Sequence, residues 1–312
     1  MIIHHDIASI QALKNAVVTI GTFDGVHLGH QKILNRIITL AKATEGETCL
    51  VTFWPHPRFV LQADEKALKL LSTFDEKAET LRQIGIDHLL KIEFTKEFSR
   101  WSSETFIQKI LIEGLNTKKL VIGYDHHFGK NREGGFEYLQ QNAEAYGFSI
   151  EEISRQDIDN VGISSTKIRN ALARGDVKEA AVFLGRPYNV NGFIKAGDKI
   201  GRTLGFPTAN VQVGAYYKLI PADGTYAVKV KVLGKMELGM LNIGSRPTVE
   251  GKEKRMEVNI FDFDQDIYDQ QIEIFFIERL RAEKKFDSKE GLIDQLKIDQ
   301  QKAQKILSDT TY

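Results

Sequence analysis

Short apolar runs alternate with longer amphipathic segments through residues 1–185. Runs that are apolar at nearly every position are typical of parallel strands buried on both faces. They predict strands at Val17–Ile20, Thr48–Phe53, His88–Ile92, Lys119–Gly123 and Phe148–Ile153. Apolar positions at helical spacing predict intervening helices at His30–Lys42, Asp75–Ile84, Ser103–Leu111 and Phe136–Tyr146. This alternation predicts a doubly wound parallel sheet, whose ligands lie beyond the carboxyl ends of its strands.

After Tyr188 the apolar period shortens to two residues, as expected for half-buried antiparallel strands. The β-rich stretches are "YNVNGFIKAG", "TYAVKVKVL", "MELGMLNIG", "RMEVNIFDF" and "QIEIFFIERL", and turn residues separate them. With a short strand near Ala209–Val213 they make about six strands, enough to close a small antiparallel barrel. Gly185 and Pro187 mark a boundary, so we expect domains at residues 1–185 and 186–312.

Residues that favour helix ends support the predicted helices. Gly85 and Gly147 follow two of the predicted helices and suit left-handed C-caps. The segment "ISSTKIRNALARGDVKEAAVFLGRP" predicts a loop and two short helices before the boundary. Near the C-terminus we expect an amphipathic helix, with Asp287 as its N-cap and Glu290 in the capping-box position.

Composition narrows the class of protein. The formal net charge is zero, which argues against a general binder of nucleic acid or of a membrane surface. No stretch approaches the ~18 apolar residues of a membrane span, and we see no signal peptide. Cys49 is the only cysteine, which excludes an intramolecular disulfide and a cysteine-rich zinc site. We expect a cytoplasmic protein, a monomer or weak homo-oligomer, whose partners are small molecules.

The stretch "GTFDGVHLGHQKIL" directly follows the first long apolar run. Gly21 allows a sharp turn, and Gly29 keeps the backbone accessible where a helix begins. The amides of that helix start, together with the imidazoles of His27 and His30, can donate hydrogen bonds to a phosphate. From these residues alone two other interpretations stay open: the histidines cap or pack, or they bind zinc at an H-x-x-H spacing.

A second group of phosphate-binding residues is predicted in "SSTKIR". Ser164, Ser165 and Thr166 place hydroxyl groups at another helix start, and Arg169 adds positive charge. Alone, this segment is equally consistent with a capped surface helix. Together with the histidine stretch, it predicts the second half of a triphosphate-binding clamp.

The segment "GDKIGRTLGFPTAN" predicts a glycine-rich loop in the second domain. Its glycines are Gly197, Gly201 and Gly205. Oxygen donors follow at Thr208 and Asn210, and a hard cation such as Mg²⁺ prefers oxygen ligands. A hairpin with turn glycines is the alternative. Glu257, an acid in the β-rich strand "RMEVNIFDF", is by default solvent-exposed.

Taken together, these motifs resemble those of the prokaryotic bifunctional riboflavin kinases/FAD synthetases. The first half carries "GTFDGVHLGH", "TFWPHP", "IGYDHHFGKNREG" and "GISSTKIRNAL", and the second carries "LGFPTAN", "PADGTYAV", "NIGSRPTV" and "EVNIFDFDQDIY". The resemblance implies a Rossmann-like nucleotidyltransferase domain that makes FAD from FMN, followed by a barrel that phosphorylates riboflavin. It also implies ATP as the co-substrate of both reactions and Mg²⁺ as their cation.

The resemblance also implies roles for single positions. Glu257 corresponds to the catalytic base of the kinase, and His27, His30 and Arg169 to catalytic residues of nucleotidyl transfer. Thr208 and Asn210 correspond to the metal site. The implied contacts with nucleotide or flavin are Gly21, Phe23, Asp24, Gly29, His56, Asp125, Phe128, Ser164, Ser165, Thr166, Gly197, Gly201, Gly205, Pro207 and Asn242.

Some positions depart from that family. Thr22 stands where many members have Asn, and "GTFD" also occurs in cytidylyltransferases, so cytidylyl transfer is an alternative for the first domain. His126, His127, Asn259 and Asp269 are further departures. A non-catalytic module that binds nucleotide and oligonucleotide is a third hypothesis, which the neutral charge and the scarcity of basic–aromatic clusters argue against.

Overall fold

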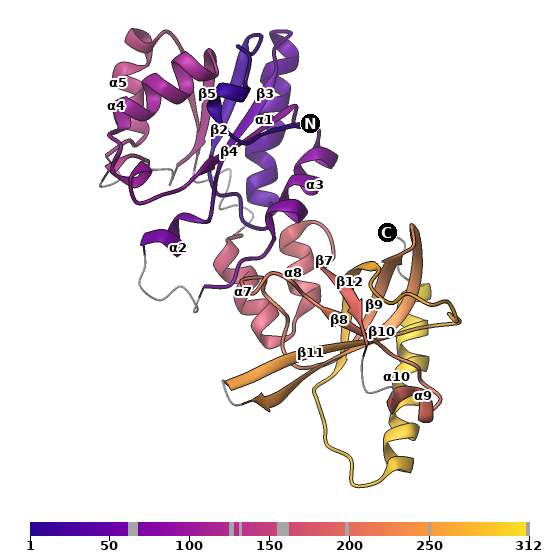
Figure 1. The fold of residues 1–312 in the computed structure, drawn as a ribbon. Coiled ribbons are helices and arrows are strands. Elements are labelled where there is room, and N and C mark those ends of the chain that lie inside the picture. The colour runs from indigo at the N-terminus through magenta and orange to yellow at the C-terminus, as the bar shows by residue number, and fades with distance from the viewer. Residues whose placement is uncertain are drawn as a thin grey trace. The chain divides into compact units, whose positions relative to one another are not determined.

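The structure, a computed structural model, describes residues 1–61, 68–124, 128–130, 133–154, 162–196, 200–248 and 251–309 (Figure 1). The chain forms two compact units, Met1–Ser165 and Thr166–Tyr312. Helices α7 (Ser165–Arg174) and α8 (Val177–Leu184) therefore fall mainly in the second unit. The expected functional boundary between residues 185 and 186 stays a prediction, because compactness does not show which reaction a residue serves.

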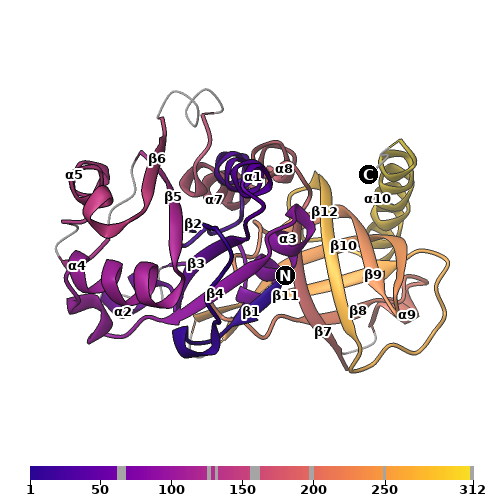
Figure 2. The same cartoon turned by 90° about the horizontal axis from the view of Figure 1, so that it is seen from above.

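Within the described residues, the first unit contains a six-stranded sheet whose neighbouring strands are all parallel. The strands are β1 (Ile2–His4), β2 (Ala16–Ile20), β3 (Thr48–Trp54), β4 (His88–Glu93), β5 (Thr117–Gly123) and β6 (Ser149–Ile153). Their order in space is β1-β4-β3-β2-β5-β6 (Figure 2). The predicted parallel sheet is confirmed, and β1 adds a short edge strand beside β4 that the sequence did not predict.

Helices cover both faces of this sheet, and Figure 2 shows α1 and α4 on opposite sides of it. The helices are α1 (Leu28–Ala43), α2 (Pro57–Leu61), α3 (Phe74–Ile84), α4 (Ser103–Phe106), its π-helical continuation η3 (Ile107–Gly114), and α5 (Phe136–Tyr146), with 3₁₀ turns η1 (Ile7–Ser9) and η2 (Phe98–Arg100). Val17 belongs to the core under α1 and α3, whereas Val18 belongs to the core under η3 and α5. Because successive side chains of a strand alternate between faces, one apolar run serves both cores.

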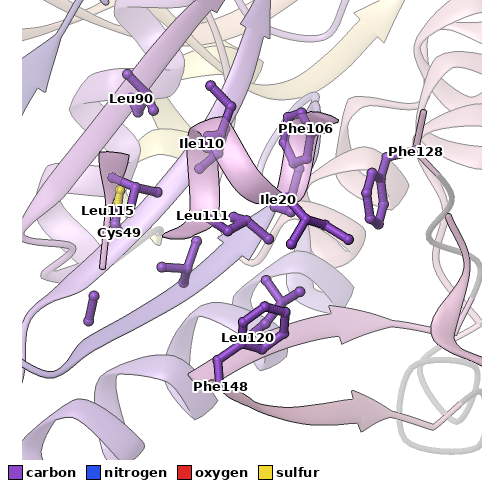
Figure 3. Close-up of a cluster of buried hydrophobic side chains, with 14 of the residues drawn as sticks. Ile20, Cys49, Leu90, Phe106, Ile110, Leu111, Leu115, Leu120, Phe128 and Phe148 are labelled. Carbon is purple, nitrogen blue, oxygen red and sulfur yellow. The ribbon is translucent and has the colours of Figure 1, made fainter. Parts of the chain in front are cut away.

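The core on the η3 side gathers side chains from several strands and helices. Cys49, Leu90 and Leu120 of the sheet meet Ile110 and Leu111 of η3 there (Figure 3). Burial raises the pKa of the Cys49 thiol to about 12. Because the thiolate is the reactive form, this cysteine is inert and acts as a small packing residue.

The predicted helix ends of the first unit are confirmed at both glycines. Gly85 ends α3 with a φ of 100°, and Gly147 ends α5 with a φ of 76°. Both values lie in the left-handed region, which glycine adopts without steric penalty. At its other end α3 has a capping box, in which the side chains and backbone of Thr73 and Glu76 bond reciprocally.

In the part of the second unit that the structure describes, six strands form a closed barrel. They are β7 (Tyr188–Lys195), β8 (Ala209–Gln212), β9 (Gly224–Val232), β10 (Lys235–Thr248), β11 (Gly251–Ile260) and β12 (Gln271–Arg281). Each strand is antiparallel to its neighbours in the order β10-β11-β8-β7-β12-β9. The predicted antiparallel barrel is confirmed. A short helix, α9 (Ile200–Thr203), lies between β7 and β8.

The C-terminal helix α10 (Lys289–Ser308) covers one outer face of the barrel. Ala303 and Leu307 are buried there with Phe206, Met240 and Phe261. The helix itself was predicted, but its N-cap was not. Ser288 is the cap, because its Oγ accepts a hydrogen bond from the N–H of Gly291, so the assignment to Asp287 was wrong by one residue. No helix in the described ranges has both the length and the apolar character needed to cross a membrane.

Candidate active sites

The chain reverses its course across the parallel sheet next to β2. From β2 it runs to β3 and β4 on one side, and then returns to β5 and β6 on the other. The crevice at the carboxyl ends of the strands flanking such a reversal is the usual ligand site of these sheets. Residues 21–30, called here the histidine loop, leave β2 at this point. Asp125 follows β5 but lies outside the described residues, as do His126 and His127.

Three residues of the histidine loop adopt the left-handed backbone region, with φ of 46° at Phe23, 82° at Gly25 and 43° at Val26. Residues with a Cβ atom rarely adopt this region, so the loop stores strain. Burial of Phe23 and Val26 in the core under α1 holds the strained backbone in place. A Cβ atom at Gly21 would lie 2.8 Å from the Phe23 ring, so this position requires glycine unless the ring moves.

His27 is the N-cap of α1, because its Nδ1 accepts a hydrogen bond from the backbone N–H of His30 at 3.3 Å. A neutral His27 therefore carries its proton on Nε2, which becomes a donor. The interpretation of His27 as a cap is confirmed. It does not compete with anion binding, since a cap occupies only one of the four unpaired N–H groups of a helix start.

The ring of His30 stacks on that of His27, with centroids 3.6 Å apart, and lies 4.9 Å from the ring of Phe23. Its Nδ1 atom is buried and has no hydrogen-bond partner in the described part of the chain. Desolvation lowers the pKa of His30 well below its usual range, and His27 and Lys77 lower it further. His30 is therefore a neutral imidazole at neutral pH, suited to donate or accept one hydrogen bond.

Asp24 is a buried anchor of the histidine loop. Its carboxylate accepts hydrogen bonds from the backbone N–H of Leu71 at 2.9 Å and of Ser72 at 3.3 Å. The Ser165 hydroxyl donates to the backbone oxygen of Asp24 at 3.1 Å, so the first residue of α7 is tied to the loop. Thr166 and Arg169 follow on α7 but belong to the second compact unit, and Ser164 is exposed.

Sequence reasoning missed Lys77 on α3, which is only 5% exposed. Its ammonium donates to the backbone oxygen of Thr22 at 3.0 Å and to the hydroxyl of Thr52 at 3.1 Å. Burial lowers the pKa of Lys77 to about 8, although the charge of Asp24 opposes this shift. No sequence signal distinguishes this lysine, because a charged residue on an amphipathic helix is expected to face solvent.

The two aromatic positions assigned to flavin contact lie in different surroundings. His56 stands just before α2, and its Nδ1 accepts a hydrogen bond from the N–H of Arg58 at 3.2 Å. Phe128 is 7% exposed, and its ring centroid lies 5.2 Å from that of Phe106 in the core on the η3 side (Figure 3). Their contacts with flavin stay predictions.

A pocket of about 340 Å³ lies beside α10 in the barrel unit. It brings together five residues that the sequence predicted for this site: Gly201, Thr208, Asn210, Asn242 and Glu257. Gly205 and Pro207 stand next to lining residues without lining the pocket, and Gly197 lies outside the described residues. A Cβ atom at Gly201 would lie 2.3 Å from the backbone oxygen of Phe206, so the chain approaches itself too closely there for any other residue.

The strand register explains why the polar residues of the pocket meet. Glu257 of β11 pairs with Asn210 of β8 on one side and with Asn242 of β10 on the other. Directly opposed residues of neighbouring strands project from the same face of a sheet. The Asn242 carboxamide oxygen is oriented by the Thr225 hydroxyl, which donates to it at 3.2 Å. The glutamate is thus flanked by two amide side chains.

Comparison with known proteins decides the family of this chain. The family model for FAD synthetase matches residues 9–167, and the family model for riboflavin kinase matches residues 184–307. A bifunctional riboflavin kinase/FMN adenylyltransferase of Listeria monocytogenes is 39% identical over 96% of this chain and 95% of that protein. The chain belongs to the bifunctional riboflavin kinase/FMN adenylyltransferase family.

A second relative and a solved structure agree with this chain in length, and the solved structure agrees with it in fold. A bifunctional riboflavin kinase/FMN adenylyltransferase of Bacillus subtilis is 37% identical, over 98% of this chain and 96% of its own. A solved structure from Streptococcus pneumoniae is 31% identical and superposes with a TM-score of 0.88, covering 97% of this chain and 98% of that one. That protein is described as a macrolide-efflux protein.

The donor set of the barrel pocket fits the cation that the family implies. Thr208 and Asn210 offer side-chain oxygen ligands, as Mg²⁺ prefers. The described residues contain no group of three or more His, Cys, Asp or Glu side chains that could hold a metal ion by itself. A cation here would complete its coordination with phosphate and water oxygens, which is the usual arrangement for Mg²⁺.

Sequence reasoning missed Arg281, a positively charged residue of the barrel pocket. Arg281 lines the pocket, and its Nε donates to Asp299 of α10 at 2.8 Å. The side chains of Arg281 and Asp299 are 19% and 1% exposed, so the carboxylate is buried and the guanidinium largely so. The guanidinium also lies 5.6 Å from the ring centroid of Phe286, another lining residue. Eighteen positions separate the paired residues, and no local pattern indicates that they meet.

Proposed function

We propose that the barrel unit phosphorylates riboflavin and that the parallel-sheet unit converts the resulting FMN to FAD, with ATP as the second substrate of both reactions. The observation that carries this proposal is the pocket that sets Glu257 between Asn210 and Asn242. It provides a carboxylate and amide groups at one face, in a unit whose sequence matches riboflavin kinase. Residues 1–185 and 186–312 are proposed as the functional halves.

In the kinase reaction the nucleophile is the terminal hydroxyl of the ribityl chain, which is neutral. As its oxygen bonds to the γ-phosphorus of ATP, the bond from that phosphorus to the β-phosphate bridging oxygen breaks and ADP leaves. The hydroxyl proton passes to Glu257, which acts as general base. Asn210 and Asn242 position that carboxylate and the substrates.

Thr208 and Asn210 are proposed to hold Mg²⁺ with the phosphates of ATP. When bound, this cation neutralises phosphate charge that would otherwise oppose the transfer. Gly201 and Gly205, with Gly197 outside the described residues, are proposed to let the backbone approach the phosphates. Pro207 fixes the chain just before the metal-binding pair.

The adenylyl transfer makes a different chemical demand. The phosphate of FMN is already ionised, so its oxygen attacks the α-phosphorus of ATP without a general base, and pyrophosphate leaves. Catalysis then consists of aligning two anions that repel each other and of neutralising their charge. The Nε2–H of His27, the neutral ring of His30 and the N–H groups at the start of α1 supply donors at the crevice.

The rest of this site is proposed from the family. Gly21 and Gly29 leave room for nucleotide, Phe23 and Asp24 shape the loop, and Asp125, His56 and Phe128 are flavin or nucleotide contacts. Ser164, Ser165, Thr166 and Arg169 form the proposed second half of the triphosphate clamp. Small molecules are the proposed partners of a cytoplasmic enzyme.

Paired variants test the assignment of the two reactions. Glu257→Gln is expected to lower FMN formation from riboflavin by about 100-fold or more, while FAD formation from supplied FMN persists. His30→Ala is expected to do the reverse. Matched controls are Glu237→Gln on the neighbouring strand β10 and His5→Ala on the exposed N-terminal segment. The two-site proposal fails if either variant, still folded, loses both activities.

The nucleotide requirement tests the alternative raised by Thr22. Wild-type protein is incubated with FMN and Mg²⁺, and with either ATP or CTP, and the flavins are separated by chromatography. We expect FAD with ATP and no dinucleotide with CTP. Turnover with CTP alone would replace adenylyl transfer by cytidylyl transfer.

A further inference from the structure

A buried lysine lies directly behind the histidine loop. Lys77 emerges from α3, and its ammonium bridges the backbone oxygen of Thr22, the second residue of the loop, and the hydroxyl of Thr52 near the end of β3. Both strands that lead into this crevice, β2 and β3, are thereby joined by one cation at their carboxyl ends. The loop conformation at Thr22 thus depends on a residue from a different helix.

Burial of this charge is unfavourable for folding. Lys77 is 5% exposed, so its ammonium has lost most of its hydration, and two neutral acceptors replace only part of it. The carboxylate of Asp24 interacts favourably with it, but its own oxygens accept the N–H groups of Leu71 and Ser72. Buried ionisable groups with shifted pKa values are often found at functional sites.

The charges that face Lys77 come from each neighbouring element. Asp24 of the loop favours its protonated form, whereas His30 of α1, with His27 stacked on it, is held neutral partly by the lysine charge. On its own helix, Phe74 lies 5.8 Å from the ammonium, measured to the ring centroid. Lys91 of β4 lies over the same ring at 4.9 Å.

We propose that Lys77 is a positioning residue of the adenylyl transfer site: it holds the histidine loop against β3 and keeps a positive charge behind the groups that receive the phosphates. This inference rests on the proposed function of that site. Lys77 adds a third positively charged or hydrogen-bond-donating group to the two histidines. This group comes from α3, outside both phosphate-binding segments. The lysine acts through the loop and through the field of its charge, and it does not contact substrate.

The first experiment separates this role from a structural one. FAD formation from FMN and ATP, FMN formation from riboflavin, and melting temperature are measured for wild type, Lys77→Met, Lys77→Arg and Lys91→Met. For Lys77→Met we expect kcat of FAD formation to fall by roughly 10- to 100-fold, with FMN formation close to that of wild type and no decrease in melting temperature. Lys91→Met is the matched control, because it removes a charge near the same ring but no bond to the loop.

The pH dependence of FAD formation tests the charge of Lys77, because a change in packing alone would not alter it. Lys77 loses its charge as the pH rises through about 8, so wild-type FAD formation is expected to fall there. Arginine stays charged throughout, so Lys77→Arg should retain activity and lack this fall. This comparison also decides the matter if Lys77→Met does not fold, since an alkaline limb that persists unchanged in Lys77→Arg overturns the proposal.

Two other outcomes have distinct meanings. If wild type forms no FAD from FMN and ATP, the proposed function of the first unit fails. If wild type forms FAD and Lys77→Met forms it equally well, or loses both activities in step with its melting temperature, only the role of Lys77 is overturned.

Discussion

Asn210 on β8 lies directly opposite Glu257 on β11 in the antiparallel register of the barrel. The pairing brings a predicted metal-site residue next to the proposed base, although 47 positions separate them in the sequence. Asn242 on β10 faces the same glutamate from the other side. Because directly opposed side chains share a face, one barrel surface carries both the cation-binding and the proton-accepting groups.

This register makes Asn210 a test of the cation site. Asn210→Ala is expected to raise the Mg²⁺ concentration that gives half-maximal FMN formation by roughly 10- to 100-fold. FAD formation from FMN should not change. Gln212→Ala, on the same strand but exposed, is the control. Equal Mg²⁺ dependence in Asn210→Ala and wild type would remove Asn210 from the metal site.

The two roles of His27 can be separated by substitution. His27→Ala removes the N-cap of α1 and is expected to lower the free energy of unfolding by about 1 kcal/mol. His27→Asn should restore most of that loss, because Asn is a strong N-cap, without restoring the imidazole donor. Both variants are therefore expected to lose FAD formation, measured with supplied FMN. Full activity in His27→Asn would show that capping is the only role of this residue.

The buried Lys77 makes stability depend on pH in a defined direction. Its pKa is about 8 in the folded protein and about 10.5 when unfolded, so the unfolded chain binds more protons between these values. The penalty for burying the ammonium, about 3 kcal/mol, is fully present below pH 8 and disappears as the pH rises to 10.5.

Urea unfolding of wild type and Lys77→Met across this range isolates the effect, because other titrations are common to both proteins. We expect the stability of wild type relative to the variant to rise with pH by about 3 kcal/mol. A difference that stays constant from pH 7 to 10.5 would mean that Lys77 titrates normally.

The buried pair of Arg281 and Asp299 joins the pocket wall to α10. Asp299→Ala leaves the guanidinium without its carboxylate and is expected to lower the free energy of unfolding by about 3 kcal/mol. The double variant Arg281→Met, Asp299→Leu should recover much of this stability. It should not recover FMN formation, because the pocket then lacks the positive charge of the Arg281 guanidinium. Urea unfolding and kinase assays check both. Lys195→Ala, which breaks the exposed pair with Asp269, is the control, with an expected effect under about 1 kcal/mol.

Local patterns were sufficient for most of the fold. Continuous apolar runs predicted the parallel strands, and two-residue alternation predicted the barrel strands, because each pattern reports how many faces of a strand are buried. The errors lie where the signal is short. β1 has only three residues, and neighbouring Asp287 and Ser288 are both good N-caps, so the backbone geometry chose between them.

The sequence by itself determined the two-part architecture, the histidine loop at a strand end and the glycine-rich segment before Thr208, since these depend on residues close in the chain. Only the tertiary structure decided that Glu257 faces Asn210, that Arg281 pairs with Asp299, and that Lys77 is buried behind Thr22. Each of these contacts joins residues from different elements. Strand register and helix packing set them, and the free energy of burial acts on the assembled fold rather than on any one segment.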